Sequence, residues 1–155
     1  MISPFICPRG SYCPKGSTFP SVCPSGTINR HEFGMNKSSC AHCPGGTYCA
    51  DSGLEEPSGD CQAGHWCGPG TTVPDPLGEA NGDRCPVGTY CEAGASAPAK
   101  CPAGTYNSDS GSESLEDCLM CPPGKFCEAG SSDSGKYCLE GYWYVVLLIR
   151  ILRGL

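Results

Sequence analysis

Large apolar residues are scarce in this chain of 155 residues. Up to Trp143 only 15 residues are Leu, Ile, Val or Phe, which is about a tenth of that stretch. Chains in which these residues fall below about a fifth rarely bury enough surface to offset the entropy of ordering. A conventional hydrophobic core is therefore excluded, and covalent cross-links must supply the difference.

Other absences limit the function. A net charge of −6 excludes a basic nucleic-acid footprint, so we expect no nucleic-acid partner. His31, His42 and His65 are isolated, and neither a nucleophile elbow nor a His-Glu-x-x-His motif occurs. We therefore expect no enzyme, no catalytic residue, no bound metal and no cofactor.

Cysteine, glycine and proline are abundant instead, with 15, 22 and 15 residues. This composition is typical of a disulfide scaffold in an oxidising, extracellular or lumenal compartment. Sustained helical periodicity is absent before the last residues, and Gly and Pro recur every ten residues or so. We expect a small disulfide-rich fold, mostly coil with short β-hairpins, built as elongated tandem modules in which each module touches mainly its neighbours.

One motif recurs along the chain, and Cys85-Pro-Val-Gly-Thr-Tyr-Cys91 is its clearest copy. Shifting the sequence by 78 residues superposes the cysteines from Cys7 to Cys49 on those from Cys85 to Cys127, and Cys61 falls on Cys138 after one deletion. We divide the chain into a first repeat copy, 7–84, a second, truncated copy, 85–143, and a divergent tail, 144–155. The stretches 68–76 and 131–135 read as linkers.

The motif predicts a turn followed by a short strand. In Cys-Pro-x-Gly, proline suits the second position of a type I turn and glycine the fourth. The aromatic residue before the second cysteine is expected to lie on a neighbouring disulfide or on the next module's turn, in place of a core. An exposed aromatic ladder that binds sugars or a partner is the alternative. These residues are Tyr12, Tyr48, Trp66, Tyr90, Tyr106 and Phe126.

Every cysteine is a disulfide candidate, although spacing alone does not determine the pairing. Our preferred scheme pairs Cys23 with Cys40 and Cys101 with Cys118. It adds Cys43–Cys61, Cys49–Cys67, Cys7–Cys13 and Cys85–Cys91. The second copy lacks a counterpart of Cys67, so Cys127 would lack a partner there. If adjacent cysteines pair instead, Cys138 is the unpaired one. The candidates are Cys7, Cys13, Cys23, Cys40, Cys43, Cys49, Cys61, Cys67, Cys85, Cys91, Cys101, Cys118, Cys121, Cys127 and Cys138.

Zinc binding, calcium binding and N-glycosylation are three further chemistries that parts of the sequence suggest. Cys40-x-x-Cys43 and Cys118-x-x-Cys121 have zinc-ligand spacing, but the remaining gaps match no standard four-ligand site. The acidic loop 109–117 lacks the spacing of a calcium-binding loop, and we expect a solvated, Ser-rich loop there. Asn36-Lys37-Ser38 is an N-glycosylation sequon, which makes Asn36 a glycosylation candidate.

Residues Cys101-Pro-Ala-Gly-Thr-Tyr, a Ser-rich stretch and Cys118-Leu-Met-Cys121-Pro-Pro-Gly resemble the ephrin type-A/B receptor-like cysteine-rich repeat, as do residues 23–46. The resemblance implies a secreted or membrane-tethered extracellular protein of many modules, related to growth-factor-like (EGF-like) and tumour necrosis factor receptor-like modules. We expect a structural or interaction segment of a larger protein whose partner is an extracellular protein or glycan. A disulfide-rich protease inhibitor is the alternative, because such repeats can also hold a reactive loop rigid.

The two ends of the chain differ from the repeats between them. Residues 1–6 lack a signal peptide, and we expect either a fragment or a missing true start. After Trp143, where Tyr144 replaces the expected cysteine, the composition becomes apolar up to Arg150. A truncation artefact, the start of a membrane span and an authentic tail are the three readings; any membrane contact is expected only through such a missing or truncated C-terminal anchor.

Overall fold

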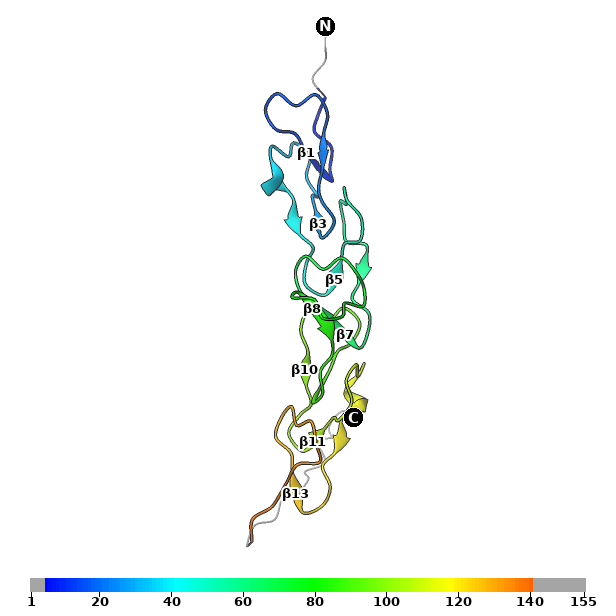
Figure 1. Ribbon diagram of the computed structural model, residues 1–155, viewed down its shortest axis with the longest axis vertical. Helices are drawn as coiled ribbons and strands as arrows, with labels where there is room; N and C mark the ends of the chain where they lie inside the picture. The colour runs from blue at the N-terminus through cyan, green and yellow to red at the C-terminus, as the bar shows by residue number, and fades with distance from the viewer. Residues whose placement is uncertain (1–4, 141–155) are drawn as a thin grey trace, which may run out of the picture.

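The computed structural model describes residues 5–140, and these form a narrow rod (Figure 1). Seven two-stranded antiparallel hairpins follow one another along the rod in chain order. This is the small disulfide-rich fold of short hairpins and coil that the composition predicts. The pairs are β1 (Ser11–Tyr12) with β2 (Ser21–Val22), β3 (Thr27–Ile28) with β4 (Ala41–His42), β5 (Thr47–Tyr48) with β6 (Gly59–Asp60), β7 (His65–Cys67) with β8 (Gly82–Arg84), β9 (Thr89–Tyr90) with β10 (Ala99–Lys100), β11 (Thr105–Tyr106) with β12 (Leu119–Met120), and β13 (Lys125–Phe126) with β14 (Lys136–Tyr137).

Each hairpin, together with the cysteine turn that precedes it, forms one unit. The first strand follows the motif Cys-x-x-Gly, and the second strand ends at the residue before the first cysteine of the next motif. Four successive units therefore make up the 78-residue copy seen in the sequence. Two short 3-10 helices, η1 (Lys37–Ser39) and η2 (Leu115–Asp117), lie at equivalent places in units 2 and 6. Units 1 to 7 begin at Cys7, Cys23, Cys43, Cys61, Cys85, Cys101 and Cys121.

The turn of the motif lies one residue later than the sequence predicts. In unit 3 the Thr47 N–H donates to the Pro44 carbonyl at 3.2 Å, so the turn is Pro-x-Gly-Thr. Gly46 is its third residue and has a φ of 87°, which is typical of a type II turn and needs glycine. The Thr47 hydroxyl donates to the same carbonyl at 2.8 Å, and this bond explains why threonine recurs after the glycine. The predicted type I turn with glycine at the fourth position was wrong.

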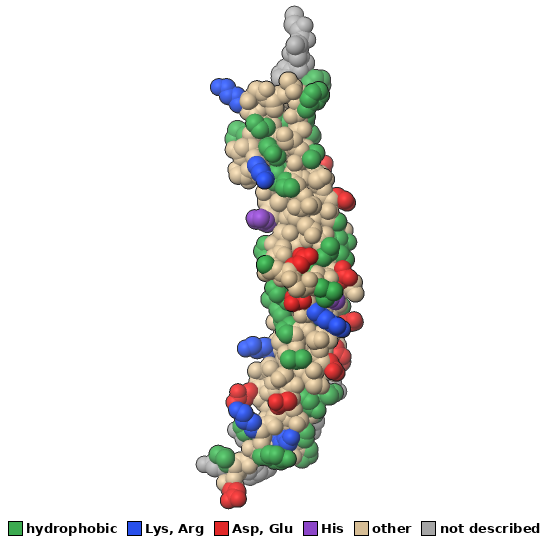
Figure 2. Space-filling model, in the orientation of Figure 1, with side chains coloured by type: hydrophobic (Ala, Val, Ile, Leu, Met, Phe, Trp, Pro, Cys, Tyr) green, Lys and Arg blue, Asp and Glu red, His purple; other side chains and the backbone are tan. Residues whose placement is uncertain are grey.

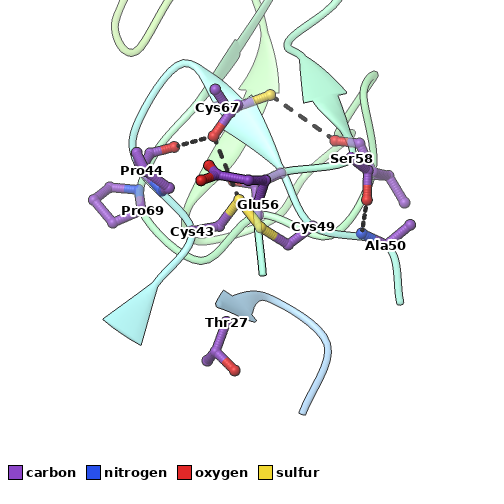
Figure 3. The surroundings of a disulfide bond; sticks show 12 residues. Thr27, Cys43, Pro44, Cys49, Ala50, Glu56, Ser58, Cys67 and Pro69 are labelled. Carbon is purple, nitrogen blue, oxygen red and sulfur yellow. Dashed lines mark hydrogen bonds between the residues drawn. A yellow bond between two sulfur atoms is a disulfide. The ribbon is translucent and has the colours of Figure 1, made fainter. Parts of the chain in front are cut away.

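The turn also determines the disulfide pairing. It folds the chain back so that the two motif cysteines of unit 3, Cys43 and Cys49, have Cα atoms 5.9 Å apart, within bonding range. Figure 3 shows this disulfide, with Cys67 of the next unit beside it. Five units close in this way: Cys7–Cys13, Cys43–Cys49, Cys61–Cys67, Cys85–Cys91 and Cys121–Cys127.

Units 2 and 6 close differently. There asparagine replaces the second motif cysteine, and the first cysteine pairs across a long loop, as Cys23–Cys40 and Cys101–Cys118. These two bonds and the short pairs of Cys7 and Cys85 confirm part of our preferred scheme. The pairings Cys43–Cys61 and Cys49–Cys67 were wrong, because the turn within one motif brings its own two cysteines together. Cys127 is bonded, and Cys138 is the unpaired cysteine.

The asparagines that replace cysteine are buried polar links to the preceding unit. Asn29 is 3% exposed, and its Nδ2 donates to the Ser11 carbonyl of unit 1 at 2.8 Å. Asn107 is 2% exposed, and its Nδ2 donates to the Thr89 carbonyl of unit 5 at 3.1 Å. Hydrogen bonding of this kind offsets the cost of burying an amide. The two long-loop units thus gain a contact that a disulfide within the motif would not provide.

Backbone hydrogen bonds join each unit to the next. At the junction of units 3 and 4, the Cys61 N–H donates to the Gly46 carbonyl at 2.8 Å, and the Gly46 N–H donates to the Cys67 carbonyl at 2.7 Å. The same two bonds recur at every junction between units 1 and 7. The motif glycine therefore uses both its N–H and its carbonyl group to hydrogen-bond the next unit.

Two further bonds complete each junction and come from the hairpin loop. At the same junction the Gly70 N–H donates to the Cys43 carbonyl at 2.9 Å, and the Cys49 N–H donates to the Thr71 carbonyl at 2.9 Å. Equivalent bonds occur at all six junctions between units 1 and 7, so four backbone hydrogen bonds repeat at each. The junctions are copies of one another despite loops of different length and composition.

Units also touch their next-but-one neighbours. A Cβ added to Gly46 of unit 3 would lie 2.3 Å from the carbonyl oxygen of Gly94 in unit 5. Glycines at the same place in four other units face a loop glycine two units on in the same way. The expectation that each module touches mainly its neighbours therefore needs this addition. These glycines are Gly10, Gly26, Gly64 and Gly88.

The centre of the rod consists of sulfur rather than hydrocarbon. Within residues 5–140, the buried hydrophobic side chains besides Pro76 are eleven cysteines and Ile28. The six motif aromatics are half-buried in their strands. Tyr48 lies across Gly59 on the paired strand, so its ring covers the opposite strand of its own hairpin.

The two stretches read as linkers are hairpin loops instead. In unit 4, Thr71 is fully buried, and its hydroxyl donates to the carbonyls of Gly68 at 2.8 Å and Asn81 at 3.0 Å. Pro76 in the same loop is also fully buried. In unit 7, Ser131 accepts a hydrogen bond from the Asn107 N–H at 3.0 Å. Both predictions failed because polar, Pro-rich composition does not distinguish a free linker from a loop that packs on its neighbour.

Phe33 is the one non-glycine residue with a positive φ in the described chain, at 65°. Its N–H donates to the Cys7 carbonyl at 3.0 Å, the junction bond that a glycine makes in each of units 3 to 7. The residue 78 positions later is Gly111. Unit 2 therefore has a bulky side chain in a backbone conformation that favours glycine.

The motif glycines predict a matched pair of substitutions. Gly46 and Gly104 have φ values of 87° and 85°, but a Cβ on Gly104 meets no described atom within 4 Å. We expect Gly104→Ala to cost about 1–2 kcal/mol from backbone strain alone. Gly46→Ala should cost at least about 3 kcal/mol, because the junction must also open. Denaturant unfolding of the oxidised proteins measures both; equal losses would contradict the close approach between units 3 and 5.

Phe33 predicts a stabilising substitution. Phe33→Gly should raise the free energy of unfolding by about 1 kcal/mol, because it removes left-handed strain from a side chain that is 67% exposed. Phe33→Ala is the control: it removes the ring but keeps the strain, and should not stabilise. Thermal unfolding of the three proteins provides the comparison, and a gain with alanine equal to the gain with glycine would argue against strain.

Candidate functional site: exposed loops and surfaces

The four cysteines with zinc-ligand spacing all form disulfides. Cys40 bonds back to Cys23, whereas Cys43 bonds forward to Cys49, so the first zinc-like spacing spans two disulfides. Cys118 and Cys121 are divided in the same way. Within residues 5–140 no group of three or more His, Cys, Asp and Glu side chains could hold a metal ion.

The three histidines lie in different units. His31 and His42 are exposed in unit 2, on the loop and on β4, and His65 is half-buried on β7 in unit 4. The Nδ1 atom of His65 is buried without a hydrogen-bond partner in the described chain. No acidic or nucleophilic side chain is hydrogen-bonded to any of the three among the residues described. The structure does not bring them together.

The loop 109–117 borders an open hollow lined by acidic and serine side chains, among them Glu113, Glu116 and Asp117. The Asp117 carboxylate accepts hydrogen bonds from the N–H groups of Glu113 at 2.8 Å and Ser114 at 3.0 Å. It therefore caps the start of η2. The loop is ordered by these bonds and by buried Ser112, whereas Glu113 and Glu116 are exposed.

The sequon residue Asn36 directly precedes η1, at the place that Ser114 has before η2. It is exposed, and its Oδ1 accepts a hydrogen bond from the Ser38 N–H at 3.0 Å. The amide nitrogen of Asn36, to which a glycan would be attached, donates no hydrogen bond to any described residue. Glycosylation at Asn36 stays a prediction, and its counterpart Ser114 has no sequon.

Asp83, on β8, orders the long loop of unit 4. Its Oδ1 accepts hydrogen bonds from the N–H groups of Gly78 at 3.0 Å and Arg84 at 2.7 Å. The hydrogen bond from Gly78, with that from Arg84, holds the pKa of the Asp83 carboxyl below its usual range. One ion pair, Arg30 with Glu56 at 2.6 Å, links units 2 and 3 at the surface. Because both side chains are exposed, it contributes little to the stability of the fold.

Cys138 begins an eighth motif. Its N–H donates to the Gly124 carbonyl at 3.0 Å, which is the first bond of the repeating junction. Its thiol is half-buried and unpaired. The rest of that motif and the apolar tail, 144–155, lie outside the described residues. The three readings of the tail therefore stay predictions. None of the described segments is a helix of the length and apolarity that a bilayer span requires.

Comparison with known proteins adds no relative: neither the protein-family models nor the curated protein sequences contain a match to this chain.

Asp83 predicts a pH dependence. Because its pKa is lowered in the folded protein, its contribution to stability is present above the usual carboxyl range and is lost as pH falls through the folded pKa. We expect the Gly78 and Arg84 amide signals to shift together in an acid NMR titration. Asp83→Asn should abolish that shared transition; if the two amides still titrate in the variant, another group is responsible.

Proposed function

We propose that this chain is an extracellular structural and interaction segment of a larger cysteine-rich protein, in which it spaces and presents neighbouring domains. The observation that carries the proposal is the identity of the junctions: the same four backbone hydrogen bonds recur between all successive units from 1 to 7. A chain of equal, ordered joints keeps its ends at a fixed separation, which is what a spacer requires.

The covalent pattern supports an oxidising environment. Seven disulfides close the described units, and such bonds persist outside the cytosol. Secretion, a glycan on Asn36 and kinship with ephrin receptor-like repeats are parts of this proposal. So are an extracellular protein or glycan as partner and attachment to a membrane through a segment beyond residue 140.

The surface chemistry favours a non-catalytic role. Two hollows of the described chain are open; one is lined mostly by alanine and glycine, the other by acidic and serine residues. Loops pinned at both ends, such as 107–117, bind at low ordering cost because they are already in one conformation. The same rigidity is what the alternative function, protease inhibition, would use.

Distance measurements test the spacer role. Probes on unnatural amino acids at exposed Lys15 and Glu79 span the first copy without using cysteine. We expect a single narrow distance distribution that does not change with salt, because backbone bonds rather than surface charges define the joints. Reduction of the disulfides should broaden it and serves as the control.

A broad or compact distribution in the oxidised protein would contradict the spacer. In parallel, titration against a panel of serine and cysteine proteases should leave every enzyme active. Stoichiometric inhibition of one protease would favour the inhibitor instead.

A further inference from the structure

The two copies share a backbone but differ in what they expose. In units 1 and 2 and just before them, six large apolar side chains are between 55% and 94% exposed. The residues 78 positions later, in and just before units 5 and 6, are charged or small. The apolar residues, which we call the N-terminal apolar surface, are Phe5, Ile6, Phe19, Val22, Phe33 and Met35; their counterparts are Asp83, Arg84, Ala97, Lys100, Gly111 and Glu113.

Because the two copies share a backbone, the second copy serves as a reference for the side chains of this surface. The counterparts show that the fold does not require apolar residues at these positions. Phe33 sharpens the point, because it keeps an exposed ring at a left-handed φ of 65° where five other units use glycine. An aromatic held at the cost of strain, and not buried by the described chain, indicates a contact made with another molecule.

Charged residues are also distributed unevenly along the rod, with basic residues dominant near the N-terminal end and acidic residues dominant beyond it. Residues 5–42 contain four basic residues, Arg9, Lys15, Arg30 and Lys37, and one acidic residue, Glu32. Beyond them, up to residue 140, acidic residues outnumber basic ones severalfold. Figure 2 shows green and blue side chains together at the N-terminal end and red ones gathered mainly below it. The basic residues in the same stretch as the N-terminal apolar surface therefore favour an acidic partner.

A surface of this chemistry exists on the chain itself, in unit 6. Leu115, Leu119 and Met120 are 41%, 52% and 54% exposed. Exposed Glu113, Glu116 and Asp117 lie among them around the open hollow. We call these six residues the acidic surface. It occupies the place that η1 and β4 occupy in unit 2, so two similar backbones present opposite charge.

We propose that the N-terminal apolar surface docks on the acidic surface of a second copy of this chain. The N-terminal apolar surface lies in and just before units 1 and 2 and the acidic surface lies in unit 6, so the two are separated along the rod (Figure 1). One chain can therefore use both surfaces at once, each with a different neighbour. Such a contact is heterologous, so association is head-to-tail and each chain keeps one surface for a further neighbour unless a ring closes. Apolar burial supplies the affinity, and the charges direct the register.

The repeat also supplies substitutions that the fold accepts. The N-terminal variant carries Phe19→Ala, Val22→Lys, Phe33→Gly and Met35→Glu, each the residue found 78 positions later, and its net charge is unchanged. The acidic-surface variant carries Leu115→Lys, Glu116→Ser and Leu119→Ala, taken from unit 2 in the same way. Leu77→Ala with Val87→Ala is the control, because these exposed side chains lie outside both surfaces.

Sedimentation velocity over a concentration series tests the proposal. All proteins carry Cys138→Ser, so an intermolecular disulfide cannot contribute, and all share the same tail. We expect the parent and the control to associate, with affinity falling at least tenfold from low to high salt. Each surface variant alone should be monomeric, with its disulfides retained and its unfolding temperature not lowered. An equimolar mixture of the two variants should form a one-to-one complex, because each keeps the surface that the other lacks.

Other occupants give different results. A parent that stays monomeric but binds anionic lipid vesicles through the N-terminal residues would overturn the proposal in favour of a membrane surface. A parent that neither associates nor binds vesicles would also overturn it. Association that persists in the acidic-surface variant would show that N-terminal surfaces pair with each other, which contradicts the docking described here.

Discussion

The backbone junction between successive hairpins is the constraint on which this structure depends. Each hairpin has only two or three residues per strand, which is too little for stability in isolation. Its cysteine and glycine peptide groups find their partners in the next unit, through four hydrogen bonds that do not depend on side-chain identity. Disulfides order each unit internally, and the junction then orders the units relative to one another. The rod follows from repeating both.

This division of labour explains the composition. A motif glycine must adopt a positive φ and also lie against the unit two places on, as Gly46 does against Gly94. Cysteine takes the interior positions because the rod is too thin for large side chains, and the aromatics are left half-buried. Stability in such an array is a sum over units and interfaces, so loop insertions of different length are accepted without changing the axis.

The sequence predicted the features that depend on local chemistry: the disulfide class, the hairpins, the 78-residue repeat and the long-loop pairs such as Cys23–Cys40. It missed those that depend on the geometry between units. The pairing of Cys43 with Cys49 follows from a turn that begins at Pro44, one residue later than expected. Thr71 and Pro76 look like linker residues until the neighbouring loop is seen to bury them. The left-handed backbone of Phe33 has no signal in its own residue type; only comparison with Gly111 could have revealed it.

The two copies thus share their interior and differ at their surface, and the proposed spacing and self-association both rest on the interior being regular. Native-state hydrogen exchange of the motif glycine amides tests that claim most directly, because each of these N–H groups bonds only across a junction. We predict similar, strong protection for Gly10, Gly26, Gly46, Gly64, Gly88 and Gly104, whose N–H groups donate over 2.7–2.9 Å. Protection confined to the amides within hairpins, with these glycines exchanging freely, would contradict the account.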